Sequence, residues 1–179
     1  MTAKGARGVN DISMPEVVRL DENDAEQLHE LLNMTWRDTY TGVLPDSVIM
    51  NAATVWHSAE TLRRQMRNKD ILFAGYKEDG RLVGMARVAM VDGDTARVYQ
   101  LYVLPGSQRR GIGTMLMNHS REHFDAAKRF VLDVSKGNEK GVAFYRRYGF
   151  RFLRESALKL GDQEIQNLEY VLEISGPEH

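Results

Sequence analysis

The sequence predicts an α+β fold, in which a mixed β-sheet carries helices on its faces. Three observations predict it. Amphipathic stripes run from residue 25 to 67, apolar runs separated by turn residues follow from 71 to 104, and 98–134 has the pattern of strand, glycine-rich turn, helix and strand. A strand, a crossover helix and a strand form a βαβ unit, which makes part of the sheet parallel. The whole chain follows the order β-α-α-β-β-β-α-β-α-β-β.

Length and composition bound the class of protein. With 179 residues the chain has room for one domain with a hydrophobic core, which we place at 14–179 after a flexible polar tail at 1–13. The net charge of −1 favours neither a nucleic acid nor a membrane as a partner. The absence of cysteine excludes disulfides, thiolate zinc sites and a cysteine nucleophile. Neither a long apolar run nor a secretory signal is found, so we expect a cytoplasmic location.

The first part of the chain predicts one strand and two helices. Residues 16–20 are short and β-prone, and acidic turn residues follow them. An apolar stripe predicts a helix from 25 to about 40, which ends before a glycine and a proline. Residues 46–67 have a second helical pattern, with a break expected near His57 and Ser58.

Three antiparallel strands are predicted next, at 71–76, 82–91 and 95–104. Glu78-Asp79-Gly80 marks the first turn. Asp92-Gly93-Asp94 marks the second, and we expect it to be a tight turn with positive φ angles.

The last part of the chain alternates between helices and strands. After the glycine-rich turn, the expected elements are a helix to about 128, a buried strand at 130–134, a helix at 140–148, and two strands at 150–160 and 168–174. Gly149 is expected to end the second helix as its C-cap, and Gly161 marks the last turn.

The glycine-rich turn has the features of an anion-binding site. The first four amides of a helix lack an intrahelical partner, and the helix dipole adds partial positive charge there. Gly111 and Gly113 let an anion approach the backbone closely, while Arg109 and Arg110 supply full charges. The turn is therefore predicted to bind a phosphate or a pyrophosphate.

Two familiar phosphate-binding loops do not fit this turn. A nucleoside triphosphate loop needs lysine and a hydroxyl residue where the chain has Ile112 and Gly113, and a dinucleotide loop needs a third glycine in place of Leu116. What fits is Q/R-x-x-G-x-G/A after a strand ending in L-x-V-x-P. The matching residues are Leu101, Val103, Pro105, Gln108, Gly111 and Gly113. This pattern resembles the central motif of the GNAT superfamily of N-acetyltransferases.

A second motif extends the resemblance. The segment NEKGVAFYRRYGF at 138–150 is similar to the later GNAT segment N-x-x-A-x-x-F/L-Y-x-x-x-G-F. Its matching residues are Asn138, Phe144, Tyr145, Gly149 and Phe150. The resemblance covers most of the chain, from about 15 to 174. It implies a three-layer α/β/α architecture with a mixed, centrally splayed sheet.

The resemblance also implies acetyl-CoA as the cosubstrate, with no metal. In the family, the loop holds the pyrophosphate and the preceding strand offers main-chain groups to the pantetheine arm. The implied cofactor-binding residues are Leu101, Tyr102, Val103, Gln108, Arg109, Arg110, Gly111, Ile112, Gly113, Thr114 and Asn138. Asn138 is also a candidate helix N-cap, and the two roles are compatible.

Tyr145 is the expected catalytic residue, because it stands at the position of the family tyrosine that protonates or hydrogen-bonds the leaving thiolate. A phenol has a reference pKa of ~10 and a thiol one of ~8.5, which permits such a donation. Tyr148 is the alternative if the helix has a different register. The strand before the loop starts with Thr95, Ala96 and Arg97 and so offers no carboxylate base. Water then takes the amine proton, or the amine arrives neutral.

The acyl acceptor is expected between residues 36–56 and the last two strands. Trp36, Tyr40 and Trp56 either line an apolar slot there or simply pack in the core. We expect direct transfer in a ternary complex to a small-molecule primary amine or polyamine. The alternatives are a protein or peptide N-acetyltransferase and a non-catalytic acyl-CoA-binding module. The oligomeric state is open, with a homodimer as one option. His119 and His123 have the i, i+4 spacing of metal ligands but lack a third ligand, so no metal site is expected.

Overall fold

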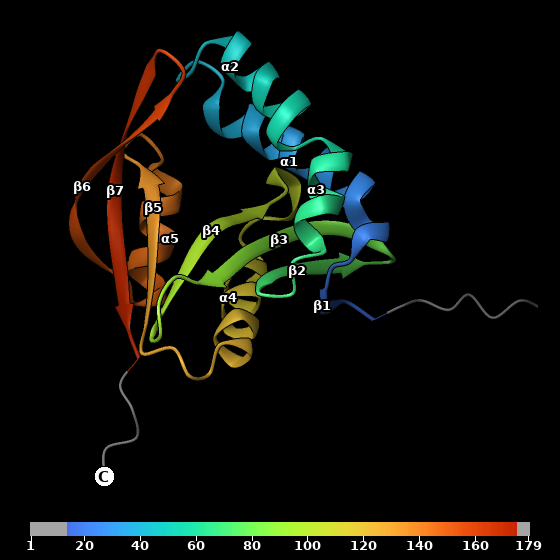
Figure 1. The fold of residues 1–179 in the computed structure, drawn as a ribbon, viewed down its shortest axis with the longest axis vertical. Coiled ribbons are helices and arrows are strands. Elements are labelled where there is room, and N and C mark those ends of the chain that lie inside the picture. The colour runs from blue at the N-terminus through green and yellow to red at the C-terminus, as the bar shows by residue number, and fades with distance from the viewer. Residues whose placement is uncertain (1–13, 175–179) are drawn as a thin grey trace, which may run out of the picture.

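A seven-stranded mixed sheet organises the computed structural model, which describes residues 14–174 (Figure 1). The strands lie in the order β1-β2-β3-β4-β5-β7-β6, and only β4 and β5 pair in parallel. Their bounds are β1 Glu16–Arg19, β2 Ile71–Glu78, β3 Arg81–Met90, β4 Thr95–Val103, β5 Arg129–Ser135, β6 Arg151–Leu160 and β7 Gln163–Glu173. The predicted α+β class and mixed sheet are confirmed. The tail predicted at 1–13 lies outside the described residues.

Helices cover both faces of this sheet, which confirms the three-layer architecture (Figure 1). Their bounds are α1 Ala25–Tyr40, α2 Asp46–Asn51, α3 Ala59–Met66, α4 Ile112–His123 and α5 Glu139–Tyr148. On one face, α1 and α3 bury an apolar cluster against β2 and β3 that includes Leu28, Leu32, Leu62, Phe73 and Met85. On the other face, α4 buries Ile112, Leu116 and Met117.

The break expected within the second helical segment is confirmed, and it is wider than the sequence indicates. Helix α2 ends at Asn51, and a π-helical turn, Ala52–Trp56, follows. The His57 amide closes this turn by donating to the Ala52 carbonyl at 2.9 Å. Helix α3 then starts after Ser58, whose hydroxyl accepts from the Thr61 amide at 3.2 Å. The wide turn carries His57 into the interior.

The prediction of positive φ angles at Asp92-Gly93-Asp94 is wrong. Among the described residues, such angles occur instead in the preceding turn, with φ of 49° at Asp79 and 74° at Gly80. The later turn is shaped by a side chain, because the Asp92 carboxylate accepts from the amides of Asp94 and Thr95 at 3.0 and 2.7 Å.

Two predicted boundaries also change. Helix α4 ends at His123 and not near residue 128, because Phe124 leaves the helical conformation at φ −106° and ψ 55°. Strand β7 begins at Gln163 and not at residue 168, because hairpin pairing with β6 continues to the tight turn at Gly161. Backbone pairing with β6 thus keeps residues 163–167 in the strand although their sequence is mostly polar.

Two features of the fold create an opening. The parallel pair β4–β5 is hydrogen-bonded only from Thr95 to Val98 on β4, so the strands separate beyond that point. The β6–β7 hairpin extends past the sheet toward α2 (Figure 1), where Ile165 packs against Leu44 and Ile49. The hairpin and α2 thus form an arch beside the separated strands.

Candidate functional site

The backbone of the glycine-rich turn points unpaired amides to one place. Arg109 and Gly111 have left-handed φ angles of 65° and 80°, which fold the chain sharply before α4. The first intrahelical bond runs from the Met115 amide to the Gly111 carbonyl at 3.0 Å. The preceding amides, those of residues 112–114, therefore have no intrahelical acceptor. Such a helix start suits an anion.

Gly113 lets α4 begin directly against α5. A Cβ atom on Gly113 would lie 3.1 Å from the Phe144 ring, which is tighter than normal packing, so the ring or the helix would have to move. At Gly106, earlier in the same turn, a Cβ atom would meet nothing within 4 Å, so this position tolerates a side chain. Among the glycines of this turn, Gly113 is therefore the one that lacks room for a side chain.

Two of the polar side chains of the turn bond to neighbouring strands, and a third is exposed to solvent. Gln108 donates from Nε2 to the Val103 carbonyl at 3.1 Å, which ties the turn to the end of β4. Arg110 forms a bidentate ion pair with Glu78, with Nη1 3.1 Å from Oε2 and Nη2 2.5 Å from Oε1. This carboxylate raises the pKa of the Arg110 guanidinium. Arg109 is exposed and forms no ion pair with a described residue. Of the two predicted cations, Arg109 is the one left free.

Strand β4 presents its predicted site residues to opposite faces. Residue 99 has no partner on β3, because Val88 pairs with Val98 and Arg87 with Gln100. After this bulge, Leu101 and Val103 pack with the α4 cluster, whereas Tyr102 packs with the α1–α3 cluster. Gln100 is two residues from Tyr102 and shares its face.

The second motif forms helix α5 as predicted. Asn138 is its N-cap, with Oδ1 accepting from the Gly141 amide at 2.9 Å. Gly149 ends it with φ 117°. Tyr148 points to α4 and donates to Asn118 Oδ1 at 2.7 Å. This register leaves Tyr145 as the tyrosine that is directed toward the sheet.

Three phenols meet beside the separated strands. Burial, and then the neighbouring Tyr40, raises the pKa of Tyr145, so its proton stays on the oxygen. Burial also raises the pKa of Tyr102 well above its ordinary value, with further contributions from Tyr40 and Tyr145. The Tyr145 ring is held by Phe144 and Phe150 at centroid distances of 5.4 and 5.7 Å. Its hydroxyl donates to no other described residue.

Trp36 links these phenols to the interior of the arch. Its ring lies 4.7 Å from Tyr40, 6.2 Å from Trp56 and 5.0 Å from His57. Trp36 Nε1 is buried without a hydrogen-bond partner. The three aromatic residues predicted for the acceptor slot, Trp36, Tyr40 and Trp56, are thus brought together, and Tyr40 lies near Tyr145.

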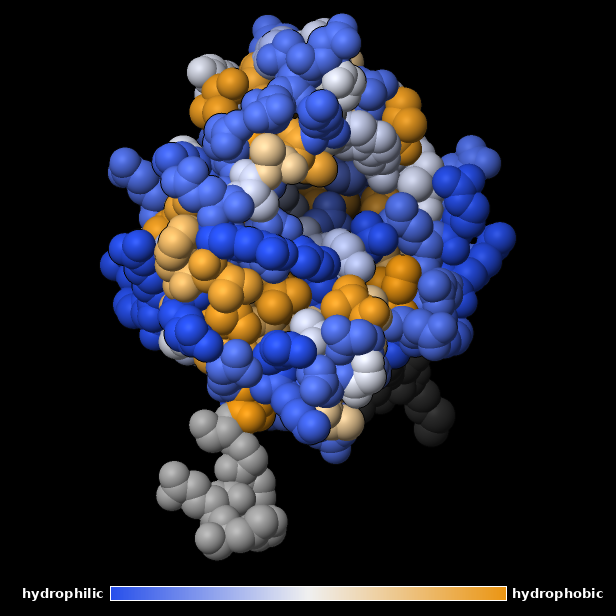
Figure 2. All heavy atoms as spheres, turned by 60° about the vertical axis from the view of Figure 1, so that its left-hand side comes forward, coloured by the Kyte–Doolittle hydropathy of each residue, from blue (hydrophilic) through white to orange (hydrophobic). Residues whose placement is uncertain are grey.

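Two cavities open beside this aromatic group, and Trp56 lines both. The first has a volume of about 390 Å³, and its lining includes His57, Arg87 and Gln100. The second, about 270 Å³, lies between α2 and the β6–β7 turn. Figure 2 shows a hollow on this face of the molecule, below the top where α2 and the turn lie.

The sequence did not identify Arg87 or Gln100, and it gave no reason to assign His57 a role in the site. A signal for Arg87 was present, since it is the one cation inside the otherwise apolar run LVGMARVAM. Only the pairing of β3 with β4 places it beside Gln100.

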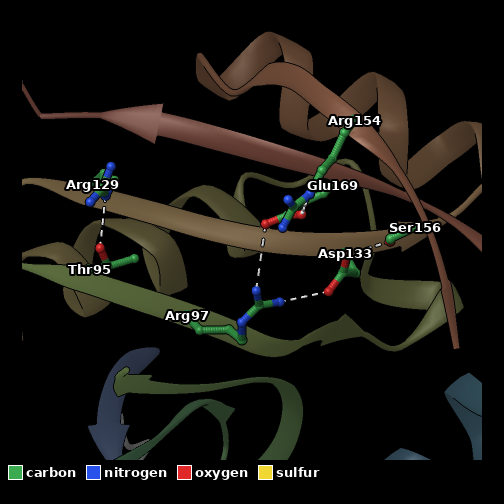
Figure 3. Close-up of polar contacts among 7 residues, drawn as sticks. All are labelled: Thr95, Arg97, Arg129, Asp133, Arg154, Ser156 and Glu169. Carbon is green, nitrogen blue, oxygen red and sulfur yellow. Dashed lines mark hydrogen bonds and ion pairs between the residues drawn. The ribbon is translucent and has the colours of Figure 1, made fainter. Parts of the chain in front are cut away.

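Two acidic side chains on the open half of the sheet, Asp133 and Glu169, are already paired (Figure 3). Arg97 contacts Asp133 at 2.6 Å and Glu169 at 3.7 Å, and Arg154 contacts Glu169 at 2.5 Å. Phe130, Leu132 and Val134 face α4 and α5, so the alternation of β5 directs Asp133 to the opposite face. Neither carboxylate is a free base.

His57 should make the protein sensitive to acid. It is 5% exposed, and burial, followed by His29 and Arg87, lowers its pKa to about 4. The unfolded chain, with a reference pKa of ~6.5, binds more protons between these values, so stability falls as pH drops from ~6.5 to ~4. The expected loss from this group is about 3 kcal/mol. The free energy of unfolding, measured with urea at several pH values in that range, should fall less steeply with decreasing pH in His57→Gln than in the wild type. His119→Gln on α4 should behave as the wild type. Parallel curves for wild type and His57→Gln would contradict the assignment.

Within residues 14–174, no three histidine or acidic side chains gather as a metal site. None of the helices in that range has the length and apolar character needed to cross a membrane.

Comparisons with known proteins agree with this geometry. The model of the acetyltransferase (GNAT) family matches residues 25–150. The chain is 28% identical over 144 residues to a spermidine N(1)-acetyltransferase of Thermoplasma acidophilum, covering 76% of this chain and 88% of that one. It is also 28% identical over 100 residues to an uncharacterized N-acetyltransferase of Mycobacterium tuberculosis, covering 55% of this chain and 64% of that protein.

Solved structures share the fold. The crystal structure of the PaiA N-acetyltransferase from Thermoplasma acidophilum, in complex with coenzyme A, superposes with a TM-score of 0.78 at 23% identity, covering 89% of this chain and 99% of that one. A GCN5-related N-acetyltransferase from Rhodopseudomonas palustris gives a TM-score of 0.73 at 16% identity, covering 94% and 100%.

Proposed function

The chain belongs to the acetyltransferase (GNAT) family and is an acyltransferase, and from this premise we propose that it moves an acetyl group directly from acetyl-CoA to a primary amine of a small molecule. The single observation that carries the proposal is the convergence of the unpaired amides of the α4 start, the separated strands β4 and β5, and Tyr145.

The start of α4 suits the pyrophosphate of acetyl-CoA. The amides of Ile112, Gly113 and Thr114 would donate to its oxygens, and Arg109 would add charge. The missing Cβ of Gly113 lets the Phe144 ring of α5 pack directly against the start of α4, which holds these amides in position. Bound there, acetyl-CoA supplies the activated acyl group, and the unpaired edge of β4 from Tyr99 to Val103 is free to bind the pantetheine arm.

The absence of cysteine supports direct transfer in a ternary complex over a mechanism with an acetylated cysteine intermediate. The chain contains no cysteine, so no thiol is available to carry the acetyl group between the two substrates. In the proposed step the amine nitrogen forms a bond to the acetyl carbon, the carbon–sulfur bond breaks, and the proton that the amine loses passes to water, which returns a proton to Tyr145. Tyr145 donates a proton to the leaving thiolate. Its raised pKa keeps it protonated, and the same dry surroundings disfavour a bare thiolate.

The acceptor is proposed to be small. The relative from Thermoplasma acidophilum is named for spermidine, a small amine, and the arch formed by Leu44, Ile49 and Ile165 narrows access to Trp36 and Tyr40. A protein or peptide N-terminus is the second candidate, and a non-catalytic acyl-CoA-binding module the third. A cytoplasmic location and a homodimer stay predictions.

The proposal is tested first by ligand-dependent melting. Acetyl-CoA at about 100 times its dissociation constant should stabilise the protein by ~2.7 kcal/mol, while ATP and NAD should not. A panel of amines, followed by thiol release, should then give turnover with intersecting initial-rate lines, as a ternary complex requires. Binding without turnover on any amine would leave the non-catalytic module. The absence of stabilisation by acetyl-CoA would overturn the proposal.

A further inference from the structure

The first cavity is lined by cations and neutral groups and by no acid. It lies between the π-helical turn, α3 and the middle of β3 and β4. Its lining residues are Val55, Trp56, His57, Thr61, Leu62, Arg64, Gln65, Arg87 and Gln100. A cavity with this lining attracts negative charge and repels the amines of a polyamine.

Arg87 is the central group of this cavity. Its guanidinium lies over the rings of Phe73 and Tyr99, at 5.5 and 5.3 Å from their centroids. Its Nε is buried without a hydrogen-bond partner, and no acidic residue in the described range forms an ion pair with it. Arg97, Arg110 and Arg154, by contrast, each have a carboxylate. A partly buried cation without a counterion is costly unless a ligand supplies one.

His57 adds a second polar group that lacks a partner. Its Nε2 lies 3.4 Å from Gln100 Nε2, which can only donate, so His57 Nε2 accepts there and the neutral ring carries its proton on Nδ1. That Nδ1 is buried without a hydrogen bond. Because the carbonyl of His57 accepts from His29 Nδ1 at 2.6 Å, the backbone is held and the ring position is defined. The groups facing His57 are His29 from α1 and Arg87 from β3, and neither is an acid.

The cavity lies close to the proposed site of acetyl transfer. Gln100 shares a strand face with Tyr102, and the Trp36 ring contacts both His57 and Tyr40. Asp133 and Glu169, on the same face of the sheet, are neutralised by Arg97 and Arg154 (Figure 3), so they do not offer a seat for a second amine.

We propose that Arg87, with His57 and Gln100, binds an anionic group of the acyl acceptor, so that the substrate is a small primary amine that also carries a carboxylate or a phosphate. This inference rests on the proposed acetyl transfer. The anion would pair with the guanidinium and accept from the imidazole, while the amine extends past Trp36 toward Tyr145. Arg87 is then a residue that determines acceptor specificity.

Matched pairs of amines test this proposal. Free lysine and cadaverine differ by a carboxylate, and phosphoethanolamine and ethanolamine differ by a phosphate. The anionic member of at least one pair should have a kcat/KM about 30-fold higher or more, and which pair responds identifies the anion. Arg87→Gln should remove the preference by raising KM, and Arg87→Lys should restore part of it. Arg63→Gln, which alters an α3 arginine paired with Glu26 outside the cavity, should leave it unchanged. Equal rates within both pairs, or a preference that survives Arg87→Gln, would overturn the proposal.

A binding measurement decides the question without turnover. Nε-acetyllysine should stabilise the wild-type protein to heat more than N-acetylcadaverine does, and the difference should vanish in Arg87→Gln, whose own melting is measured alongside. A resonance from the His57 ring should also shift on addition of the anionic ligand alone. If acetyl-CoA binds but no amine is acetylated, the proposed function fails while this measurement still tests the cavity. Equal stabilisation by the two ligands refutes the cavity assignment, and it would favour a polyamine acceptor near Asp162 of the second cavity.

Discussion

Gly113→Val is expected to weaken acetyl-CoA binding about 100-fold, because displacing the amides loses one or two hydrogen bonds to a charged group, each worth ~1.5–3 kcal/mol. The new Cβ would lie 3.1 Å from the Phe144 ring, and the branched side chain adds two further carbons at that point. Either α5 or the first turn of α4 must move, and the amides that are proposed to hold the pyrophosphate move with it. Titration calorimetry with acetyl-CoA measures the affinity directly.

The matched control is Gly106→Ala in the same turn. A Cβ there meets nothing within 4 Å, and Gly106 does not have a positive φ angle, so its affinity should equal that of the wild type. The melting temperature of each variant without ligand separates loss of binding from loss of folding, since overpacking by itself costs ~1–3 kcal/mol. An unchanged affinity in a folded Gly113→Val protein would remove the pyrophosphate from this turn.

Tyr145→Phe is expected to lower kcat roughly 100-fold while acetyl-CoA binding stays as in the wild type, which is the size of effect that a general acid supplies. The phenylalanine ring keeps the packing against Phe144 and Phe150. The hydroxyl it removes makes no hydrogen bond to a described residue, so the fold loses little. Steady-state turnover and acetyl-CoA calorimetry, measured together, test both halves of the prediction.

Tyr148→Phe is the matched control, because it removes the same atom from the same helix. Its hydroxyl bonds to Asn118 on α4 and faces away from the phenol group of Tyr40 and Tyr102. Its turnover should therefore stay close to that of the wild type. If the two variants lose activity equally, or if Tyr145→Phe turns over normally, Tyr145 does not donate the proton.

The features that local backbone chemistry determines could be predicted from the sequence. Gly149 and Asn138 were expected to cap α5, and both do so through their own conformation or side chain. The order of strands and helices followed from periodicity, which each segment carries by itself. Positive φ angles were predicted at 92–94 but occur at Asp79 and Gly80 in the preceding turn. The later turn does without them because the Asp92 carboxylate accepts a hydrogen bond from the backbone.

The anion site shows how far such reasoning extends. Its glycines and its helix start lie within eight residues of one another, at 106–113, so their spacing is visible in the chain. The sequence could not indicate that Arg110 pairs with Glu78, which is distant along the chain and comes from the end of β2. Sequence alone therefore assigned two free cations where the structure leaves one.

By itself, then, the sequence determined the fold class and the βαβ unit with its glycine-rich turn, and it predicted a phosphate site at that turn and a role for Tyr145, because each depends on residues close together in the chain. Only the tertiary structure decided the acceptor side. The cavity on that side combines three separate segments, which are the π-helical turn before His57, strand β3 with Arg87 and strand β4 with Gln100 and the bulge at residue 99. Their meeting depends on strand register, and a shift of one residue in register turns a side chain to the opposite face of the sheet.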